Sequence, residues 1–138
     1  DLGRLVLFGR SLGCAVAADL ASKNDVQGVV LESPFTSIRA MAKRAYPFLP
    51  GIGSLVRTRY DTLSKVGRIG APLMVLHGDR DDIAPFDMGG AVFETATPPK
   101  RYHKIEGAGH NDTYSVGGRA YYEALGKFLD SLPRGIEE

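Results

Sequence analysis

The sequence contains few features that would cross-link the chain, carry it across a membrane or attract it to nucleic acid. Its 138 residues include one cysteine, Cys14, which excludes a disulfide within the chain. No apolar run approaches the roughly 18 residues of a membrane-spanning helix. Seventeen basic and sixteen acidic residues leave a net charge of +1, without a basic patch that would favour nucleic acid as a partner. With 43% hydrophobic residues, the chain is long enough for one domain with a core.

What the sequence does contain is a series of short apolar runs that alternate with helical patterns. The runs predict strands at residues 5–8, 29–32, 73–77 and 102–106. Helices are predicted at residues 12–22, 86–95 and 118–132. The last helix has one apolar face, made of Tyr121, Leu125, Phe128, Leu129 and Leu132. This alternation predicts an α/β fold with a parallel sheet and flanking helices, whose reactive groups lie at the carboxyl ends of the strands.

A longer connection, residues 33–71, separates the second predicted strand from the third. Four apolar residues in it have the spacing of one short helix, which Pro47 ends: Ile38, Met41, Ala42 and Ala45. A second amphipathic segment is predicted near residues 54–60.

The residues between the first strand and the first helix form a pattern with chemical meaning. Gly9-Arg10-Ser11-Leu12-Gly13 has the form G-x-S-x-G, which between a strand and a helix predicts a nucleophile elbow. We expect larger residues in place of Gly9 or Gly13 to collide with the adjoining strand and helix. The amide of Leu12, at the helix N-terminus, is the expected donor to an oxyanion. The alternative is a tight turn in which Ser11 only caps the helix.

Two further strand ends carry an acid and a histidine. The third strand leads into a loop with Asp79, Asp81 and Asp82, and the fourth leads into His110 between glycine and asparagine. The chain order of Ser11, an acid and then His110 is the order found in α/β-hydrolases, and it differs from the order in the two main protease folds.

In these motifs the chain resembles the C-terminal half of an α/β-hydrolase-superfamily serine hydrolase. The family pattern H-G-x-x-D-x-x-V-P has counterparts in His77, Gly78, Asp81 and Pro85, with Ala84 in place of the usual valine. The family pattern G-x-G-H corresponds to residues 107–110.

The residues of these motifs are most similar to those of small hydrolases of the bud-emergence type. Those proteins carry G-R-S-L-G, then E-S-P-F-T-S, then G-H-N-D-T, and here these motifs occupy residues 9–13, 32–37 and 109–113. The similarity runs from Leu5 to about Leu132, which is nearly the whole chain.

The resemblance implies a serine hydrolase that cleaves carboxylic esters or thioesters through an acyl-serine intermediate. In it Ser11 is the nucleophile, His110 the base and Asp81 the acid that orients the histidine. It implies a small acyl ester or thioester as substrate, and neither a cofactor nor a metal ion. Residues 33–71 would form a lid-like insertion in this partial α/β-hydrolase domain, or else a satellite core beside the sheet. A non-catalytic binding relative of the fold and an acyltransferase with the same triad remain alternatives.

Other acidic residues compete for the role of the triad acid. Glu32, at the end of the second strand, is the credible rival of Asp81. We expect Asp79 and Asp82 to cap the loop or to remain solvated.

Five more polar side chains near the motifs are predicted to support the structure rather than the chemistry. His77 is expected to serve the turn after its strand, and His103 lies within a strand. Arg10 is expected to form a salt bridge near the elbow. Asn111 and Asp112 are expected to support the histidine loop.

An α/β-hydrolase sheet has eight strands, and this chain has counterparts of only the last four. The strand that would pair with the far side of residues 5–8, and the loop with the second oxyanion donor, are expected outside this sequence. We therefore predict a fragment whose partner is the missing N-terminal half, or a second copy that pairs through the edge of the first strand. Right-handed crossovers predict three connections on one face of the sheet and the C-terminal helix on the other.

Overall fold

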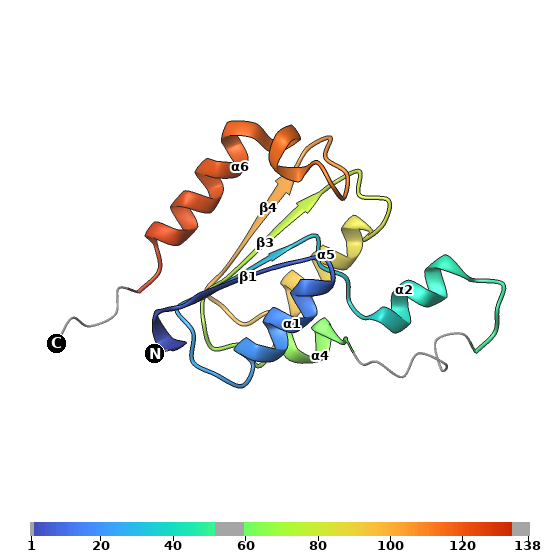
Figure 1. The fold of residues 1–138 in the computed structure, drawn as a ribbon, viewed down its shortest axis with the longest axis horizontal. Coiled ribbons are helices and arrows are strands. Elements are labelled where there is room, and N and C mark those ends of the chain that lie inside the picture. Colours follow the sequence, from blue (N-terminus) through green and yellow to red (C-terminus); the bar gives the residue numbers. More distant parts are fainter. Residues whose placement is uncertain (1, 52–59, 134–138) are drawn as a thin grey trace.

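Four parallel strands form the centre of the structure, a computed structural model in which residues 2–51 and 60–133 are described (Figure 1). The strands are β1 (Val6–Arg10), β2 (Gly28–Glu32), β3 (Leu73–Gly78) and β4 (Lys100–Ile105). They pair side by side in chain order, so β1 and β4 are the two edges of this sheet. All four carboxyl ends therefore lie at the same end of the sheet. The predicted α/β class is confirmed.

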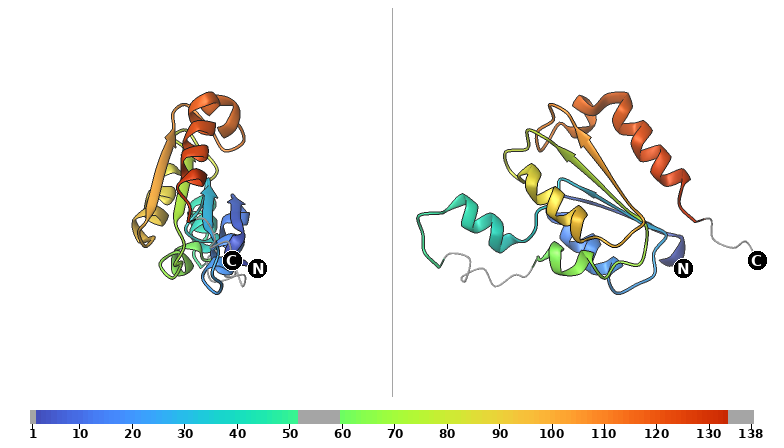
Figure 2. Two further views of the ribbon diagram at one scale, coloured as in Figure 1. Left: turned by 90° about the vertical axis from the view of Figure 1, so that its left-hand side faces the viewer. Right: turned by 180° about the vertical axis from the view of Figure 1, so that it is seen from behind.

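The helices lie on both faces of the sheet, as the crossover rule predicts (Figures 1 and 2). One face is covered by α1 (Leu12–Ala21), α4 (Thr62–Val66) and α5 (Phe86–Thr95). Among the described helices, α6 (Thr113–Asp130) is the one that covers the opposite face. A short 3₁₀ turn (Leu2–Arg4) precedes β1, and α2 (Ile38–Ala45) projects beyond the carboxyl ends of the strands. No helix in the described part of the chain is long and apolar enough to cross a membrane.

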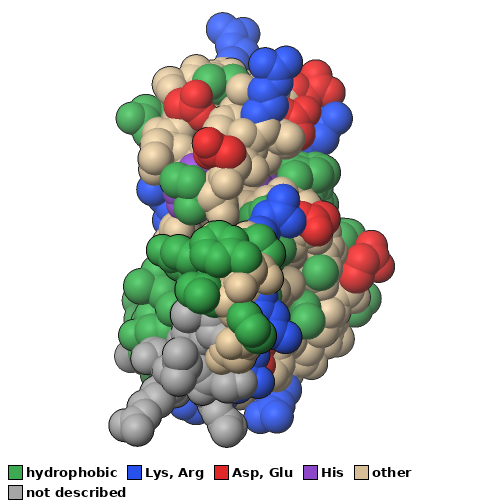
Figure 3. All heavy atoms as spheres, turned by 90° about the vertical axis from the view of Figure 1, so that its right-hand side faces the viewer, with side chains coloured by type: hydrophobic (Ala, Val, Ile, Leu, Met, Phe, Trp, Pro, Cys, Tyr) green, Lys and Arg blue, Asp and Glu red, His purple; other side chains and the backbone are tan. Residues whose placement is uncertain are grey.

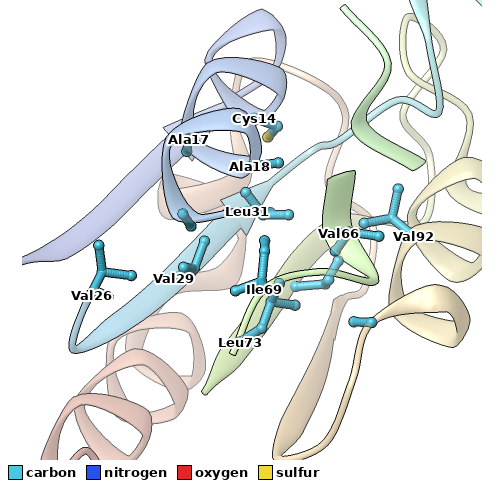
Figure 4. Packing of buried hydrophobic residues seen from close by; sticks show 13 residues of the cluster. Cys14, Ala17, Ala18, Val26, Val29, Leu31, Val66, Ile69, Leu73 and Val92 are labelled. Atoms are coloured by element: carbon cyan, nitrogen blue, oxygen red, sulfur yellow. The ribbon is translucent and has the colours of Figure 1, made fainter. Parts of the chain in front are cut away.

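The core consists of two layers, because successive side chains of a strand point to opposite faces. The layer under α1, α4 and α5 is built on Val29, Leu31, Leu73 and Val75, and Figure 4 shows how these strands meet α1. The layer under α6 is built on Val30, Met74, Leu76 and Ile105, against which Phe128 of α6 packs. Every residue of β2 and β3 is buried, since both faces of these central strands are covered. Each fully buried Val, Leu or Phe side chain contributes about 1.5–3 kcal/mol relative to an exposed one.

Several element boundaries differ from those predicted. β1 begins one residue later than expected and continues to Arg10. The last helix, α6, consists of two helical segments that meet at Gly118, whose φ of 51° and ψ of −136° are not helical. The second segment begins where the helix was predicted, and the first segment, from Thr113, was not predicted. Leu129, predicted on its buried face, is 42% exposed, because it follows the buried Phe128 and each residue of a helix is rotated about 100° from the last.

The long connection contains one predicted helix and one that was missed. The short helix expected from the apolar spacing is α2, which Ser37 caps through a hydrogen bond from the Ala40 amide, 3.1 Å long. The amphipathic segment predicted at 54–60 lies, except for Tyr60, outside the described residues. The missed helix, α4, begins after Asp61, whose carboxylate accepts a hydrogen bond from the Ser64 amide at 3.1 Å. An Asp before a short apolar stretch was the available signal.

Candidate active site

Ser11 lies on a tight turn between the end of β1 and the start of α1. Its φ of 52° and ψ of −118° place a residue with a side chain in a conformation that costs about 1–3 kcal/mol. The turn is held on both sides: the Ser11 amide donates to the Glu32 carbonyl at 2.9 Å, and the Ser11 carbonyl accepts from the Cys14 amide at 3.0 Å. This strained turn has the geometry expected of a nucleophile elbow.

The two glycines of the elbow differ in what surrounds them. A Cβ on Gly9 would lie 2.5 Å from the Gly13 carbonyl oxygen and 2.8 Å from the Cys14 Cα, so the strand could not pass so close to the helix. A Cβ on Gly13 would meet nothing within 4 Å in the described part of the chain. The expected collision is therefore confirmed for Gly9 and wrong for Gly13, because the space beside Gly13 is open.

Asp81 follows β3 and is buried, with both carboxylate oxygens in use. Oδ1 accepts hydrogen bonds from the backbone amides of Ile83 at 3.0 Å and Ala84 at 2.8 Å. Oδ2 lies 2.8 Å from Nδ1 of His110. The two amides leave the carboxylate one orientation, in which its second oxygen faces the histidine.

His110 follows β4 and joins the other two residues. Its Nε2 lies 2.9 Å from Oγ of Ser11, so the ring stands between Ser11 and Asp81. An ionised carboxylate only accepts hydrogen bonds, so we assign the proton to Nδ1, which leaves Nε2 free to accept the Ser11 hydroxyl proton. The distances agree with the hydrogen bonds expected from the sequence.

Leu12 is the first residue of α1, where backbone amides have no acceptor within the helix. Its amide follows the strained Ser11 peptide directly, at the positive end of the helix dipole. This is the position expected for one oxyanion donor. Among residues 2–51 and 60–133, no group of three or more His, Cys, Asp or Glu side chains is arranged to hold a metal ion.

The competing acids lie elsewhere. Glu32 is buried, and its carboxylate faces Arg10 rather than His110, with Oε2 3.8 Å from the Arg10 Nε. Asp79 accepts a hydrogen bond from the Gly107 amide at 2.8 Å, and Asp82 is exposed. Geometry therefore selects Asp81 as the partner of His110, and the predicted Arg10 salt bridge is present.

The two other histidines are held within the structure. The His77 ring is fully buried, with Nε2 2.7 Å from the Ala84 carbonyl oxygen, so it donates to the loop that carries Asp81. Burial lowers the pKa of His77, although the Ala84 carbonyl and Asp81 act in the opposite direction. His103 lies in β4, and partial burial lowers its pKa too. Cys14 is fully buried, and burial raises the pKa of its thiol.

A cavity of about 370 Å³ opens beside Ser11, and its lining is almost entirely apolar. The lining residues are Ser11, Leu12, Phe35, Ile38, Met41, Ala42, Ala45 and Ile83. Figure 3 looks onto this end of the molecule, where hydrophobic side chains gather. The spacing of apolar residues in α2 predicted an apolar face, but not that this face would line a cavity beside Ser11. The sequence did not indicate that Phe35 and Ile83 line the cavity too, because they lie in separate loops.

A parallel sheet with a strained serine, a histidine and an aspartate at its carboxyl ends defines the α/β-hydrolase fold. No family model matches the sequence. The uncharacterised protein Rv2307c of Mycobacterium tuberculosis is 37% identical over 129 residues, covering 94% of this chain and 46% of that protein. The human α/β hydrolase domain-containing protein 17B is 31% identical over 129 residues, covering 91% of this chain and 41% of that protein.

Solved structures agree at the level of the fold. The esterase domain of a Rhodothermus marinus protein superposes with a TM-score of 0.67 at 19% identity, covering 92% of this chain and 61% of that one. The chain therefore has the α/β-hydrolase fold, and over most of its length it is similar to a relative named for that domain. It spans less than half the length of the curated relatives that it matches.

Proposed function

We propose that the protein is a serine hydrolase that cleaves carboxylic esters or thioesters through an acyl-serine intermediate. The observation that carries the proposal is the His110 ring, which makes one contact of 2.9 Å to Ser11 and another of 2.8 Å to Asp81. A serine that is only a helix cap has no need of a buried histidine and carboxylate in line with it.

In the proposed reaction, Ser11 Oγ attacks the carbonyl carbon of the substrate while His110 Nε2 takes the hydroxyl proton. The Leu12 amide donates to the oxyanion of the tetrahedral intermediate. When the intermediate collapses, the alkoxide or thiolate leaves with the proton from His110. Water then gives a proton to His110 while its oxygen attacks the acyl carbon. When this second intermediate collapses, His110 returns the proton to Ser11 Oγ and the carboxylic acid is released. Asp81 holds the ring and stabilises the imidazolium in both halves.

The cavity beside Ser11 supports an acyl group as the part of the substrate that is bound there. It is lined by Ser11 together with Leu12, Met41, Ile83 and other apolar residues. An alkyl chain in this space loses contact with water, whereas a charged or hydroxylated group would lose its hydrogen bonds. Since α2 provides half of this lining, we propose that residues 33–71 act as a lid-like element.

The test is covalent labelling with an organophosphonate ester, followed by identification of the modified peptide. We expect the label on Ser11, and we expect none in Ser11→Ala or His110→Gln. Ser64→Ala, which changes an exposed serine of α4, is the matched control and should label as the unchanged protein does.

Label on another residue, or unchanged labelling of Ser11→Ala, would contradict the proposal.

A further inference from the structure

An ion pair between a buried carboxylate and a partly exposed arginine lies next to the elbow. Arg10 and Glu32 are partners in the register of β1 and β2, and the Arg10 Nε lies 3.8 Å from the Glu32 Oε2. Glu32 is 3% exposed, while the arginine side chain is 40% exposed. A carboxylate this deeply buried is retained at a cost unless it has a charged partner. The pair therefore fixes the arginine stem at the end of β1.

The other end of the arginine reaches the loop that carries the histidine. One terminal nitrogen of Arg10 donates to the backbone carbonyl oxygen of His110 and lies 3.3 Å from Oδ1 of Asn111. These residues are about 100 positions away in the sequence. The guanidinium thus connects the strand that ends in Ser11 with the backbone of the residue that must accept the Ser11 proton.

Glu32 also holds the elbow through its backbone. Its carbonyl oxygen accepts from the Ser11 amide at 2.9 Å and from the Cys14 thiol at 3.1 Å. One residue therefore supports the serine turn with its carbonyl group and the histidine loop with its carboxylate, through Arg10. The Asp81 contact fixes the imidazole ring, but no Asp81 contact restrains the His110 backbone.

We propose that Arg10, anchored by Glu32, is a positioning residue that sets the distance between Ser11 and His110. The proposal rests on the proposed hydrolase function. Arg10 touches neither reacting atom. Its hydrogen bond to the His110 carbonyl oxygen holds the His110 backbone at a fixed distance from the elbow and so restrains the loop.

The planar fork of arginine suits this position, and lysine does not. Arginine directs Nε toward Glu32 and a terminal nitrogen toward the His110 carbonyl at the same time. A lysine ammonium is a single charged point that can neutralise Glu32 but cannot span both partners. Arg10→Lys therefore removes the link and keeps the positive charge beside the buried carboxylate.

The first measurement is the steady-state kinetics of Arg10→Lys with a small activated ester. We expect kcat to fall about tenfold to a hundredfold, because a displacement near 1 Å costs about that much. KM should stay within about twofold, since the cavity does not include Arg10. The melting temperature should be unchanged. Arg101→Lys, at an exposed position of β4, is the matched control and should leave kcat unchanged.

The second measurement does not depend on activity. Hydrogen exchange of residues 107–112 should rise in Arg10→Lys and in the double variant Arg10→Met/Glu32→Gln, which leaves no buried charge unpaired, but not in Arg101→Lys. Unchanged exchange and a kcat within twofold would overturn the positioning role. If the unchanged protein has no Ser11-dependent esterase activity, the proposed function fails, and the exchange result still decides whether Arg10 restrains the loop.

Discussion

Two serines adopt left-handed backbone conformations at neighbouring strand ends. Ser11 follows β1 with φ of 52°, and Ser33 follows β2 with φ of 51°. Each amide is tied to the next strand over: Ser11 to the Glu32 carbonyl, and Ser33 to the Leu76 carbonyl at 2.8 Å. Both turns occur where the chain leaves the sheet at its carboxyl end. The strained residues therefore lie beside the candidate site, at the carboxyl ends of the strands, where hydrogen bonds to the neighbouring strands hold them in place.

His77 makes the stability of the protein depend on pH. Burial lowers its pKa below the ordinary value of 6.5, so the folded protein binds fewer protons at this residue than the unfolded chain does. Its stabilising contribution is therefore complete above pH 6.5 and is lost as the pH falls below it. We expect the free energy of unfolding to decrease there by up to about 1.4 kcal/mol per pH unit from this group. Urea unfolding between pH 5 and pH 7.5 measures it.

The control replaces His77 with a residue that keeps the hydrogen bond to Ala84 but cannot become charged. His77→Gln retains an N–H donor for the Ala84 carbonyl and should flatten the pH dependence. His103→Gln should flatten it less, because His103 is only partly buried. Equal slopes in the unchanged protein and His77→Gln would contradict this assignment.

Among the elements, α2 has an unusual position for a helix of this fold. Its residues contribute nothing to the two core layers, and none of them is fully buried. Its apolar side, Ile38, Met41, Ala42 and Ala45, instead lines the cavity at Ser11, while Lys43 is exposed. The helix therefore lines the cavity beside Ser11 and adds nothing to the buried core of the sheet.

This position predicts a dependence on acyl chain length. Each methylene buried in the cavity contributes about 0.8 kcal/mol, or roughly fourfold in kcat/KM, until the space is filled. Ala42→Phe fills part of the cavity, so we expect it to lower kcat/KM for octanoyl esters and to leave that for acetyl esters nearly unchanged. A series of p-nitrophenyl esters measures the effect.

Lys43→Phe adds the same ring one position along the helix, on an exposed residue, and should leave the chain-length profile as it was. If both variants behave alike, or if the unchanged protein shows no preference from acetyl to octanoyl esters, α2 does not line the acyl site.

At the scale of the whole molecule, the β1 edge of the described sheet is unpaired and carries an exposed apolar side chain. β1 has no neighbour on its outer edge in the described sheet, and Phe8 on it is 48% exposed. On α1, which follows β1 in the chain, Leu12, Val16 and Leu20 recur every four residues and are exposed as well. Such an edge with apolar side chains recruits another chain or segment.

We therefore expect the 138-residue chain by itself to associate at micromolar concentrations, through β1 and most simply about a two-fold axis. Sedimentation velocity measures the association. Phe8→Lys should reduce it, because a charge on an edge strand disfavours pairing. Tyr122→Lys, at an exposed position on α6, should not. A monodisperse monomer with a cooperative melt would contradict the expectation.

Much of the architecture follows from patterns that are local in the sequence. The apolar runs of β2 and β3, the G-x-S-x-G turn and the spacing of α2 each describe a few consecutive residues. Backbone periodicity and steric limits act over the same short range, so these elements are readable without a structure. Because carboxyl ends of parallel strands meet at one edge, the proximity of Ser11, Asp81 and His110 was predictable too.

What the tertiary structure alone decided are contacts between segments that the sequence does not relate. Sheet register placed Glu32 beside Arg10 and not beside His110, and so separated the rival acid from the histidine. The packing of loops brought Phe35 and Ile83 to the cavity, and it left Gly13 without the neighbour that its motif suggests. Each of these contacts depends on how segments tens of residues apart pack together, and neither local periodicity nor local steric rules determine that packing.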